Sequence, residues 1–364
     1  MSANNSESKR YRVAMAGGTG YGGAELIRLL MNHPRVELAR VTSIDRVGEP
    51  LEAVHLNLYN TGLVFEEMPV VDAAKDMDVL FLGLPHKVSS TLAPQLDQTD
   101  ARVIDLSGDF RLTDKDRYAK YYGQEHPHPE QLEGGRWVFG LPEFNRELIR
   151  GATRIASPGC FATTLLLGLL PLAHSGLLKG AVQSIACTGS SGSGAYASAG
   201  THHPVRVNNM KIYKPLNHQH KPEIEEVLVA AGERSGKAQP FNLNFVPVSA
   251  PLARGILATS FVSLPEDTDP DQIEAMFRDY YEDAAFVRVL GSGPRHAEVI
   301  AIKGSMWVDL SWVLGPAENG MRQLVIATAL DNLVKGGAGQ AVQSMNISLG
   351  LPEGMGIDAP ALWP

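Results

Sequence analysis

The sequence predicts an α/β protein with a Rossmann-type first domain and an α+β second domain that contains a mixed sheet. Residues 11–42 read as strand, glycine-rich turn, helix and strand, which is the order of a nucleotide-binding βαβ unit. After residue 160, predicted strands outnumber predicted helices, which is typical of an α+β domain. The chain has 364 residues, a length that suits two domains of ordinary size.

The glycine-rich turn lies between a predicted strand at 11–16 and a predicted helix at 24–32, and a second strand follows at 36–42. Its glycines fit the spacing G-x-x-G-x-x-G and let the backbone approach a pyrophosphate at the helix N-terminus. Because the spacing differs from G-x-G-x-x-G, a plain tight turn between strand and helix is the alternative. If the turn binds a dinucleotide, the contacting residues are Gly17, Thr19, Gly20, Tyr21 and Gly22.

The residues after the second strand indicate which dinucleotide would bind. An NAD enzyme typically places an acidic side chain here, on the ribose hydroxyl. In this chain Ser43 ends the strand and Arg46 follows. Because the two could hold a 2′-phosphate, we expect NADP. Asp45 could contact the ribose instead, and an ordinary solvated loop is the third possibility.

Two further strands, predicted at 79–84 and 102–106, each run into a polar loop. Ligands bind beyond the carboxyl ends of the strands in a doubly wound sheet. Gly83 and Pro85 are therefore candidate cofactor contacts, and Ser107 and Arg111 are candidate anion contacts. Arg111 could equally form a salt bridge with Asp109 in its own loop.

Cys160 follows a Pro158-Gly159 turn and precedes an apolar run that predicts a largely buried helix. Unpaired N–H groups and the positive end of the helix dipole favour a thiolate at such a position. The pKa of a cysteine there can fall well below its usual value of about 8.5, and the thiolate is the nucleophile. A buried structural cysteine is the alternative.

The second half of the chain predicts strands at 181–188, 243–248, 255–263 and 299–308, and helices at 223–231 and 271–284. The apolar spacing from Leu324 to Val334 predicts an amphipathic helix at 322–335, and a short helix follows at 340–346. We expect this C-terminal segment to pack on the first domain. Residues 1–156, completed by 322–364, would then bind NADP, and residues 157–321 would form the catalytic and oligomerisation domain.

Three polar segments of the second half could contribute to a site. His218 and His220 precede a predicted helix, and histidine suits proton transfer near neutral pH; a structural role is equally open. Ser191 and Gly192 belong to a glycine/serine loop that could bind an anion or be a flexible surface loop. Arg254 could bind a carboxylate or phosphate, or be a surface arginine.

Composition and charge exclude several classes of protein. The chain is 44% hydrophobic and 20% charged, which is ordinary for a soluble enzyme. A net charge of −8 argues against a nucleic-acid binder, and no uncharged run reaches the ~20 residues of a membrane helix. Two cysteines are too few for a disulfide framework, and the N-terminus lacks a signal peptide's apolar core. A lone H-x-H pair is a poor zinc signal, so we expect a cytoplasmic protein without a metal.

A series of motifs resembles the N-acetyl-gamma-glutamyl-phosphate reductases of arginine biosynthesis, which are similar to the aspartate-semialdehyde dehydrogenases. The motifs run in the family's order over nearly the whole chain. They are GGTGYGGAEL (17–26), DLSGDFRL (105–112), GLPE (140–143), SPGCFAT (157–163), HQHKPEI (218–224), RGILAT (254–259) and DNLVKGGAGQA (331–341).

The resemblance implies an NADP-dependent acyl-phosphate reductase. Cys160 would form an acyl-thioester, and one of His218 and His220 would be the acid/base. N-acetyl-gamma-glutamyl phosphate would be reduced to N-acetylglutamate 5-semialdehyde. The second domain would also make the subunit contact of a homodimer or homotetramer. The glycine-rich turn and the segment 336–340 would hold NADP, with further contacts from Asn332, Gly339 and Gln340.

The segment THHPVR (201–206) instead resembles a sister branch, the reductase of carrier-protein-linked aminoadipyl phosphate in lysine biosynthesis. An acidic carrier protein would need a basic docking face. The chain is acidic overall, but Arg206, Lys211 and Lys214 could supply a local basic patch. A non-catalytic NADP-binding regulator on the same fold is a remote alternative, and the presence of both the cysteine and the histidine pair argues against it.

Overall fold

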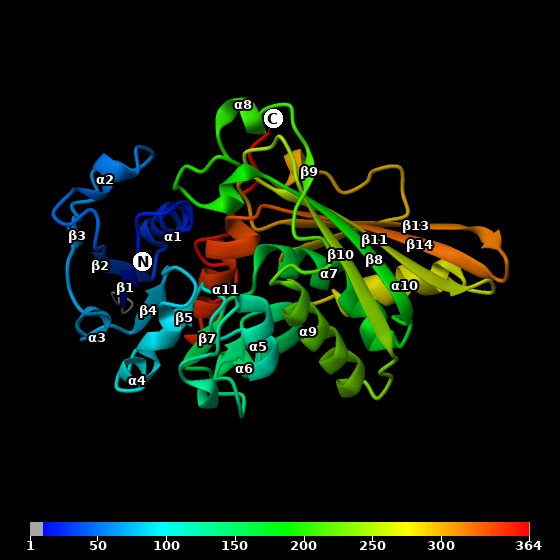
Figure 1. The fold of residues 1–364 in the computed structure, drawn as a ribbon, viewed down its shortest axis with the longest axis horizontal. Coiled ribbons are helices and arrows are strands. Elements are labelled where there is room, and N and C mark those ends of the chain that lie inside the picture. Colours follow the sequence, from blue (N-terminus) through cyan, green and yellow to red (C-terminus); the bar gives the residue numbers. More distant parts are fainter. Residues whose placement is uncertain (1–9, 364) are drawn as a thin grey trace, which may run out of the picture.

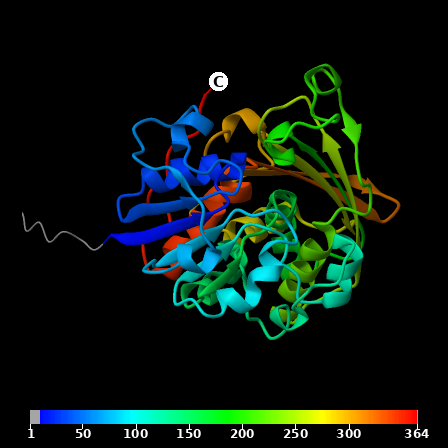
Figure 2. The same cartoon turned by 60° about the vertical axis from the view of Figure 1, so that its left-hand side comes forward.

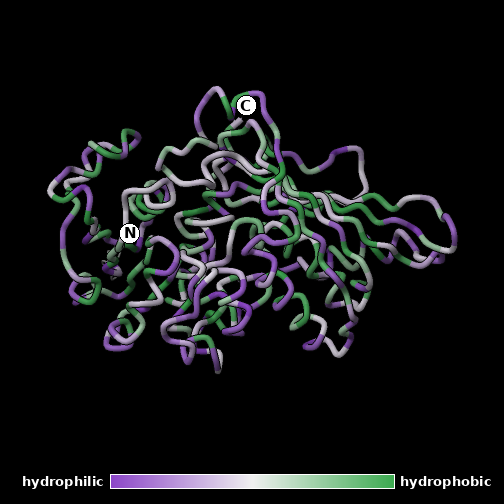
Figure 3. Tube along the Cα trace, viewed as in Figure 1, coloured by the Kyte–Doolittle hydropathy of each residue, from purple (hydrophilic) through white to green (hydrophobic). Residues whose placement is uncertain are grey.

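The structure is a computed structural model that describes residues 10–363, and within that range it contains two seven-stranded sheets. The first sheet is formed by the N-terminal part of the chain. The second sheet carries the long strands on the right of Figure 1. Hydrophilic residues gather in the outer loops, for example at the far tip of the second sheet in Figure 3.

The first sheet is parallel throughout and has the strand order β3-β2-β1-β4-β5-β7-β6. The order reverses between β1 and β4, and in doubly wound sheets a ligand crevice opens at such a point. All four residues of β4 are buried, as expected for a strand covered on both faces. The strands are β1 (Tyr11–Ala16), β2 (Val36–Thr42), β3 (Phe65–Glu66), β4 (Val79–Leu82), β5 (Arg102–Asp105), β6 (Val138–Phe139) and β7 (Arg154–Ala156).

Helices connect these strands. The first of them begins at Tyr21, directly after the glycine-rich turn, and buries Leu26, Ile27 and Leu30 in the core of this domain. These positions lie on one face of a helix with 3.6 residues per turn. The helices are α1 (Tyr21–Met31), α2 (Leu51–Val54), α3 (Val70–Ala73), α4 (Ala93–Leu96), α5 (Lys115–Tyr122) and α6 (Pro142–Arg150).

The second sheet is mixed, as the sequence predicts, with the order β12-β13-β14-β11-β8-β10-β9. The pairs β8/β10 and β12/β13 are parallel, and the remaining pairs are antiparallel. The strands are β8 (Gly180–Thr188), β9 (Lys211–Ile212), β10 (Phe241–Ser249), β11 (Ile256–Pro265), β12 (Val287–Gly291), β13 (Val308–Glu318) and β14 (Met321–Leu330).

The central helix of the second part is α7 (Cys160–Ser175), which is buried from Phe161 to Ala173. It packs against β11 and β14 of the sheet and against two other helices, α9 (Lys221–Arg234) and α10 (Pro270–Tyr280). Figure 1 shows these three helices on one side of the second sheet. A short helix, α8 (His203–Arg206), lies in the loop before β9.

The C-terminal segment returns to the first sheet. A π-helical turn, η5 (Val334–Ala338), leads into α11 (Gly339–Ser348), and α11 packs against α1 and α6. Figure 2 shows this red segment beside the blue first sheet. Within residues 10–363, no helix is both long enough and apolar enough to span a membrane.

Two predicted elements are wrong. Residues 322–330, predicted as a helix, form β14 instead, which pairs with β11 and β13. This stretch therefore belongs to the second sheet and does not complete the first domain. Residues 299–308, predicted as a strand, form a short 3₁₀ turn and a loop, and β13 begins only at Val308.

Candidate active site

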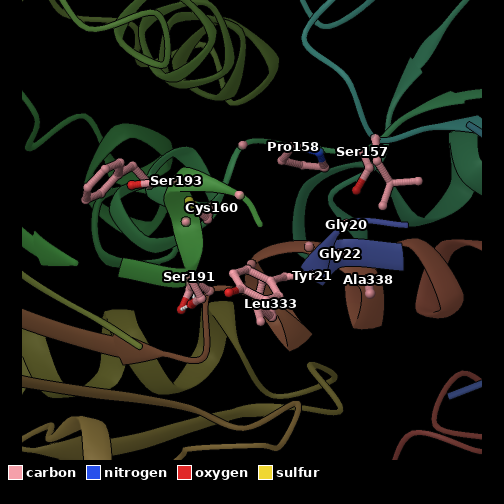
Figure 4. A pocket seen from close by; sticks show the side chains of 18 of the residues that line it. Gly20, Tyr21, Gly22, Ser157, Pro158, Cys160, Ser191, Ser193, Leu333 and Ala338 are labelled. Atoms are coloured by element: carbon pink, nitrogen blue, oxygen red, sulfur yellow. Dashed lines mark hydrogen bonds between the residues drawn. The ribbon is translucent and has the colours of Figure 1, made fainter. Parts of the chain in front are cut away.

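A pocket of about 500 Å³ lies between the glycine-rich turn, the start of α7 and η5. Figure 4 shows Cys160 with Ser191 and Ser193 on one side and Gly20 and Gly22 on the other. Most of the residues predicted for the site meet here. Those that line the pocket are Gly17, Gly20, Tyr21, Gly22, Gly83, Arg111, Cys160, Ser191, Gly192, His218, His220 and Asn332.

Cys160 is the first residue of α7, and Gly159 precedes it without a side-chain cap. A Cβ on Gly336 would lie 2.9 Å from the Cβ of Cys160, so glycine lets η5 approach the cysteine. Contrary to the expectation from the helix dipole, the pKa of Cys160 is raised to about 11. Desolvation raises it and outweighs the charge of Arg111 and the N–H of Phe161. The resting cysteine is therefore a thiol that needs a base.

His220 is the histidine that lies against the cysteine turn. A Cβ on Gly159 would overlap its Nε2 atom, so the turn can approach the imidazole only because this residue is glycine. His218 supports its neighbour, because its Nδ1 accepts the backbone N–H of His220 at 3.2 Å. Burial lowers the pKa of His218 to about 4 and that of His220 well below its usual value. Both rings are thus neutral near pH 7, and because Nδ1 of His218 already accepts an N–H, His220 is the one of the two with a nitrogen left to accept a proton.

Glu223 is a buried acid beside the histidines that the sequence analysis does not assign to the site. Its Oε2 accepts the backbone N–H of Gly159 at 3.2 Å. Its Oε1 lies 3.6 Å from Arg111 Nη1 and 3.8 Å from His220 Nε2. Desolvation raises the pKa of Glu223 to about 7. Glu223 lies in the first turn of α9, where a glutamate is ordinarily explained by the helix dipole.

Arg111 holds the loop before the cysteine in place. Its Nε donates to the carbonyl of Ser157 at 2.7 Å, and its Nη2 donates to the carbonyl of Leu106 at 2.9 Å. The buried guanidinium favours the thiolate form of Cys160. Asp109, the alternative partner within the loop, accepts backbone N–H groups instead.

The glycine-rich turn fits the pyrophosphate of a dinucleotide. Gly17 has a φ of +84°, and a Cβ there would lie 2.7 Å from the carbonyl oxygen of Gly83, so the turn is packed tightly against the end of β4. Gly20 precedes α1 without a side-chain cap, which leaves N–H groups of the first turn for phosphate oxygens. The backbone is open at Gly20 and Gly22, where an added Cβ would meet nothing within 4 Å.

The residues predicted to hold a 2′-phosphate lie in the loop after β2. Ser43 donates its hydroxyl to Asp45 at 2.6 Å, and Arg46 pairs with Glu49 at 3.4 Å. Tyr196, from a loop of the second part of the chain, also donates to Asp45, at 2.7 Å. The hydroxyls of Ser43 and Tyr196 lower the pKa of Asp45. The carboxylate of Asp45 therefore already accepts hydrogen bonds from within the protein.

Two predicted substrate contacts have other partners in the structure. Ser107 is buried and donates its hydroxyl to Asp105 at 2.6 Å. Arg254 pairs with Glu25 and Asp331, at 3.1 Å in each case, and lines a separate pocket beside α1. These partners already engage polar atoms of both side chains.

Four predicted cofactor contacts lie beside or beneath the pocket lining. Thr19 directly precedes Gly20, which lines the pocket, and Pro85 lies between Leu84 and His86, which both line it. Gly339 and Gln340 are buried at the start of α11, and a Cβ on Gly339 would overlap side chains of the core. The pocket is lined instead by the preceding residues of the same motif, Asn332, Leu333, Gly336, Gly337 and Ala338.

His86 and Tyr213 also line the pocket, and the sequence analysis did not assign them to the site. His86 follows Pro85 in the loop after β4, so the rule that ligands bind beyond strand ends could have found it. Tyr213 lies just after β9, a two-residue strand that is too short for any sequence pattern to indicate.

Two family models match the chain: the semialdehyde dehydrogenase NAD binding domain over residues 12–152 and the semialdehyde dehydrogenase dimerisation domain over residues 160–332. Aspartate semialdehyde dehydrogenase II from Vibrio cholerae has the same fold, with a TM-score of 0.68 at 16% identity over 94% of this chain and 99% of that one. The aspartate semialdehyde dehydrogenase of Candida albicans, solved with NADP, gives 0.64 at 15% identity over 93% and 98%.

Sequence relatives cover nearly the whole chain. The N-acetyl-gamma-glutamyl-phosphate reductase of Methanosphaera stadtmanae is 40% identical over 97% of this chain and 98% of its own. The LysW-L-2-aminoadipate 6-phosphate reductase of Deinococcus radiodurans is 36% identical over 98% and 99%. The chain therefore belongs to the semialdehyde dehydrogenase family of oxidoreductases, beside the N-acetyl-gamma-glutamyl-phosphate reductases and the LysW-linked aminoadipate phosphate reductases.

Proposed function

We propose that this enzyme uses NADPH to reduce N-acetyl-gamma-glutamyl phosphate to N-acetylglutamate 5-semialdehyde, through a thioester on Cys160. The observation that carries the proposal is the shared pocket, which is lined by Cys160, by a dinucleotide-type glycine turn and by the imidazole of His220. The relative from Methanosphaera stadtmanae, named for this reaction, supports the choice of substrate.

In the first step, His220 accepts the thiol proton and the sulfur of Cys160 attacks the acyl carbon of the substrate. The carbon–oxygen bond to the phosphate breaks, and an acyl-thioester forms on Sγ. A base is required because the pKa of Cys160 is raised to about 11. The charge of Arg111 and the uncapped N-terminus of α7 stabilise the negative charge that develops on sulfur and on the carbonyl oxygen.

In the second step, the thioester is reduced to a thiohemiacetal, and His220 returns the proton to its oxygen. The thiohemiacetal then collapses, the semialdehyde leaves, and Cys160 regains its proton. Glu223 supports this exchange, because it lies 3.8 Å from Nε2 of His220 and holds the Gly159 N–H. Splitting the reaction at a covalent intermediate divides one difficult step into two easier ones.

NADPH supplies the hydride when it is bound. Backbone N–H groups at the start of α1 would hold its pyrophosphate. Leu333 and the glycines of η5 would enclose its reactive end, because they line the pocket beside Cys160. Ser43 and Arg46 would hold the 2′-phosphate, for which Arg46 must leave its exposed ion pair with Glu49. Such a pair contributes little stability.

The second candidate is a carrier-linked substrate, as in the LysW-linked relatives. The observation that favours it is a group of basic side chains in the segment 203–214, beside the pocket. Arg206, Lys211 and Lys214 lie there, and the charge of Lys214 acts on both His218 and His220. An acidic carrier protein could dock on this segment and deliver its acyl phosphate to Cys160.

The matched dimerisation domain supports a homo-oligomer, for which we propose a dimer or tetramer that works in the cytoplasm. The substrate assignment is tested by running the reaction in reverse. Purified enzyme is given NADP, phosphate and either N-acetylglutamate semialdehyde or a carrier-linked aminoadipate semialdehyde. We expect phosphate-dependent NADP reduction with the acetylated substrate, and none with Cys160→Ser. Turnover only with the carrier-linked substrate would favour the second candidate, and turnover with neither would refute both.

A further inference from the structure

His86 is a pocket residue that has no role in the proposed mechanism. It lies in the loop after β4 and lines the same pocket as Arg111, Cys160 and His220. Part of its side chain is exposed there. Its charge would act on His220, so the two rings are near neighbours across the pocket.

Hydrogen bonding fixes the tautomer of His86. The backbone N–H of Gly108 points at its Nδ1, at 2.8 Å, so Nδ1 is the acceptor. A neutral imidazole carries its one proton on the other nitrogen, which makes Nε2 a donor. The ring also stands edge-on against Tyr122, with 5.8 Å between the centroids, so two loops and a helix determine its direction.

The loop that carries His86 is held in a strained conformation. Lys87, the next residue, has a φ of +74°, a region that residues other than glycine rarely adopt. The backbone N–H of Lys87 donates to Asp109 Oδ1 at 2.7 Å, and that of Ser90 donates to Oδ2 at 2.8 Å. Such strain persists only where the surroundings enforce it, and it clusters at functional sites.

Most of the charges around His86 are positive. The charges of Arg111, Lys214 and Lys87 act on the ring, and Asp109 is the opposing charge. Burial, and then the charge of Arg111, lower the pKa of His86 to about 4. Near pH 7 the ring is therefore a neutral donor in a region of positive potential, which suits an anion with several acceptor oxygens.

We propose that Nε2–H of His86 donates a hydrogen bond to a phosphoryl oxygen, in the acyl phosphate and in the inorganic phosphate that leaves. The proposal rests on the proposed function, in which phosphate is a product of the forward reaction and a substrate of the reverse reaction. The phosphoryl group is the part of the substrate with the most acceptor oxygens, and it is bonded to the acyl group that Cys160 attacks. His86 thus binds and orients the leaving group, while His220 handles the proton.

The test compares the KM for phosphate in the reverse reaction among variants. For His86→Ala we expect this KM to rise about tenfold or more, as for loss of a hydrogen bond to a charged group. The KM values for semialdehyde and NADP should stay within about twofold. His86→Gln should recover most of the loss, because its amide nitrogen is as many bonds from Cβ as Nε2 is. His86→Asn should resemble His86→Ala.

Thr91→Ala is the matched control. Its hydroxyl donates to the carbonyl of Val88 at 2.7 Å in the same loop, so this change disturbs the loop and leaves the donor in place. We expect a KM for phosphate close to that of the wild type. If the KM for phosphate rises similarly in Thr91→Ala and His86→Ala, the structure of the loop sets the affinity for phosphate, and a hydrogen bond from His86 does not. That result would overturn the proposal.

A second measurement separates this proposal from the proposed function. Inorganic phosphate is titrated against the alkylation of Cys160 by iodoacetamide, without NADP or semialdehyde. Phosphate should protect the wild type, and His86→Ala should need about ten times more phosphate for the same protection. Equal protection of both, or none in the wild type, would refute the role of His86. If neither semialdehyde is oxidised, the proposed function fails and this titration still decides the role of His86.

Discussion

At the scale of single residues, two influences act in opposite directions on Cys160. The charge of Arg111 and the helix N-terminus favour the thiolate, and desolvation disfavours it more strongly. The sequence contains the favourable part, since a Pro-Gly-Cys turn before an apolar run predicts a helix N-terminus. The sequence does not show the desolvation, because the segments that surround Cys160 are distant in the chain. Gly336 of η5, for example, packs against the Cβ of Cys160 although it lies 176 residues further along (336 − 160).

The first prediction concerns the reactivity of this thiol. Because the pKa of Cys160 is raised to about 11, only a small fraction is thiolate at neutral pH. The alkylation rate by iodoacetamide should rise about tenfold per pH unit between pH 7 and pH 10. Mass spectrometry of the modified peptide separates Cys160 from Cys187, the other thiol. A rate that levels off below pH 8 would show that the thiolate is already favoured in the free enzyme.

The second prediction is that the two histidines contribute unequally. His220 lies against the turn before Cys160, whereas His218 accepts the backbone N–H of His220. His220→Ala should lower the turnover number by roughly 10²–10⁴, as for loss of a general acid–base. His218→Ala should act mainly through KM or stability. Steady-state kinetics of the two variants, compared at the same folded fraction, check both expectations. Equal and small losses of turnover in the two variants would mean that neither histidine transfers the proton.

Several site residues escaped the sequence analysis for a common physical reason. Glu223 is recognisable only through a partner distant in sequence, the N–H of Gly159. The place of His86 beyond β4 is visible in the sequence, but the direction of its ring depends on the N–H of Gly108, which is not. A glutamate in the first turn of a helix and a histidine in a loop have ordinary local explanations. The anion contact of Arg254 stays a prediction, and in the structure its guanidinium pairs with Glu25 and Asp331.

At the scale of elements, the βαβ unit was predictable because strand, turn and helix each have a local signal. The predicted strands at 11–16 and 36–42 match β1 and β2. The segment 322–330 was ambiguous, because Leu324, Ile326 and Leu330 fit part of a helical stripe. They also alternate along one face of a strand, and pairing with β11 and β13 decides for the strand. Such pairing is non-local and therefore invisible to a sequence window.

The third prediction concerns η5, the turn that approaches Cys160. Lys335 is fully buried, and its Nζ donates to Glu143 Oε1 and to Gln343 Oε1, at 2.7 Å each. Lys335→Met would leave the buried Glu143 without its cation, which typically costs about 3–5 kcal/mol of unfolding free energy. It should also raise the KM for NADPH, since η5 lines the pocket. Urea unfolding and kinetics measure the two effects.

The matched variant for this prediction is Lys335→Met combined with Glu143→Gln, which removes both buried charges. It should recover a large part of the lost stability, because an uncharged pair carries no unpaired buried ion. If the single and double variants unfold at the same urea concentration, the ion pair does not stabilise η5.

At the scale of the whole molecule, the pocket is lined by residues from both parts of the chain and by η5 of the C-terminal segment. Tyr196, from the second part of the chain, reaches Asp45 in the loop after β2. If Ser43 and Arg46 hold the 2′-phosphate, as proposed, that end of the cofactor site includes residues from both parts. The sequence places Ser43, Asp45 and Arg46 in one loop, but nothing in it indicates that Tyr196 donates a hydrogen bond to the Asp45 carboxylate.

The last prediction follows from this arrangement and concerns the choice of cofactor. Asp45 already accepts hydroxyls from Ser43 and Tyr196, and Arg46 is held only by an exposed pair with Glu49, so the guanidinium is available to a 2′-phosphate. We expect the wild type to prefer NADPH. Arg46→Ala should raise the KM for NADPH by about tenfold, because it removes one charge-assisted hydrogen bond. The KM for NADH should change little. Glu49→Gln is the matched control, because it releases Arg46 and should leave the KM for NADPH unchanged or lower. Steady-state kinetics with both cofactors decide the matter, and a wild type that prefers NADH would mean that Asp45 binds the ribose.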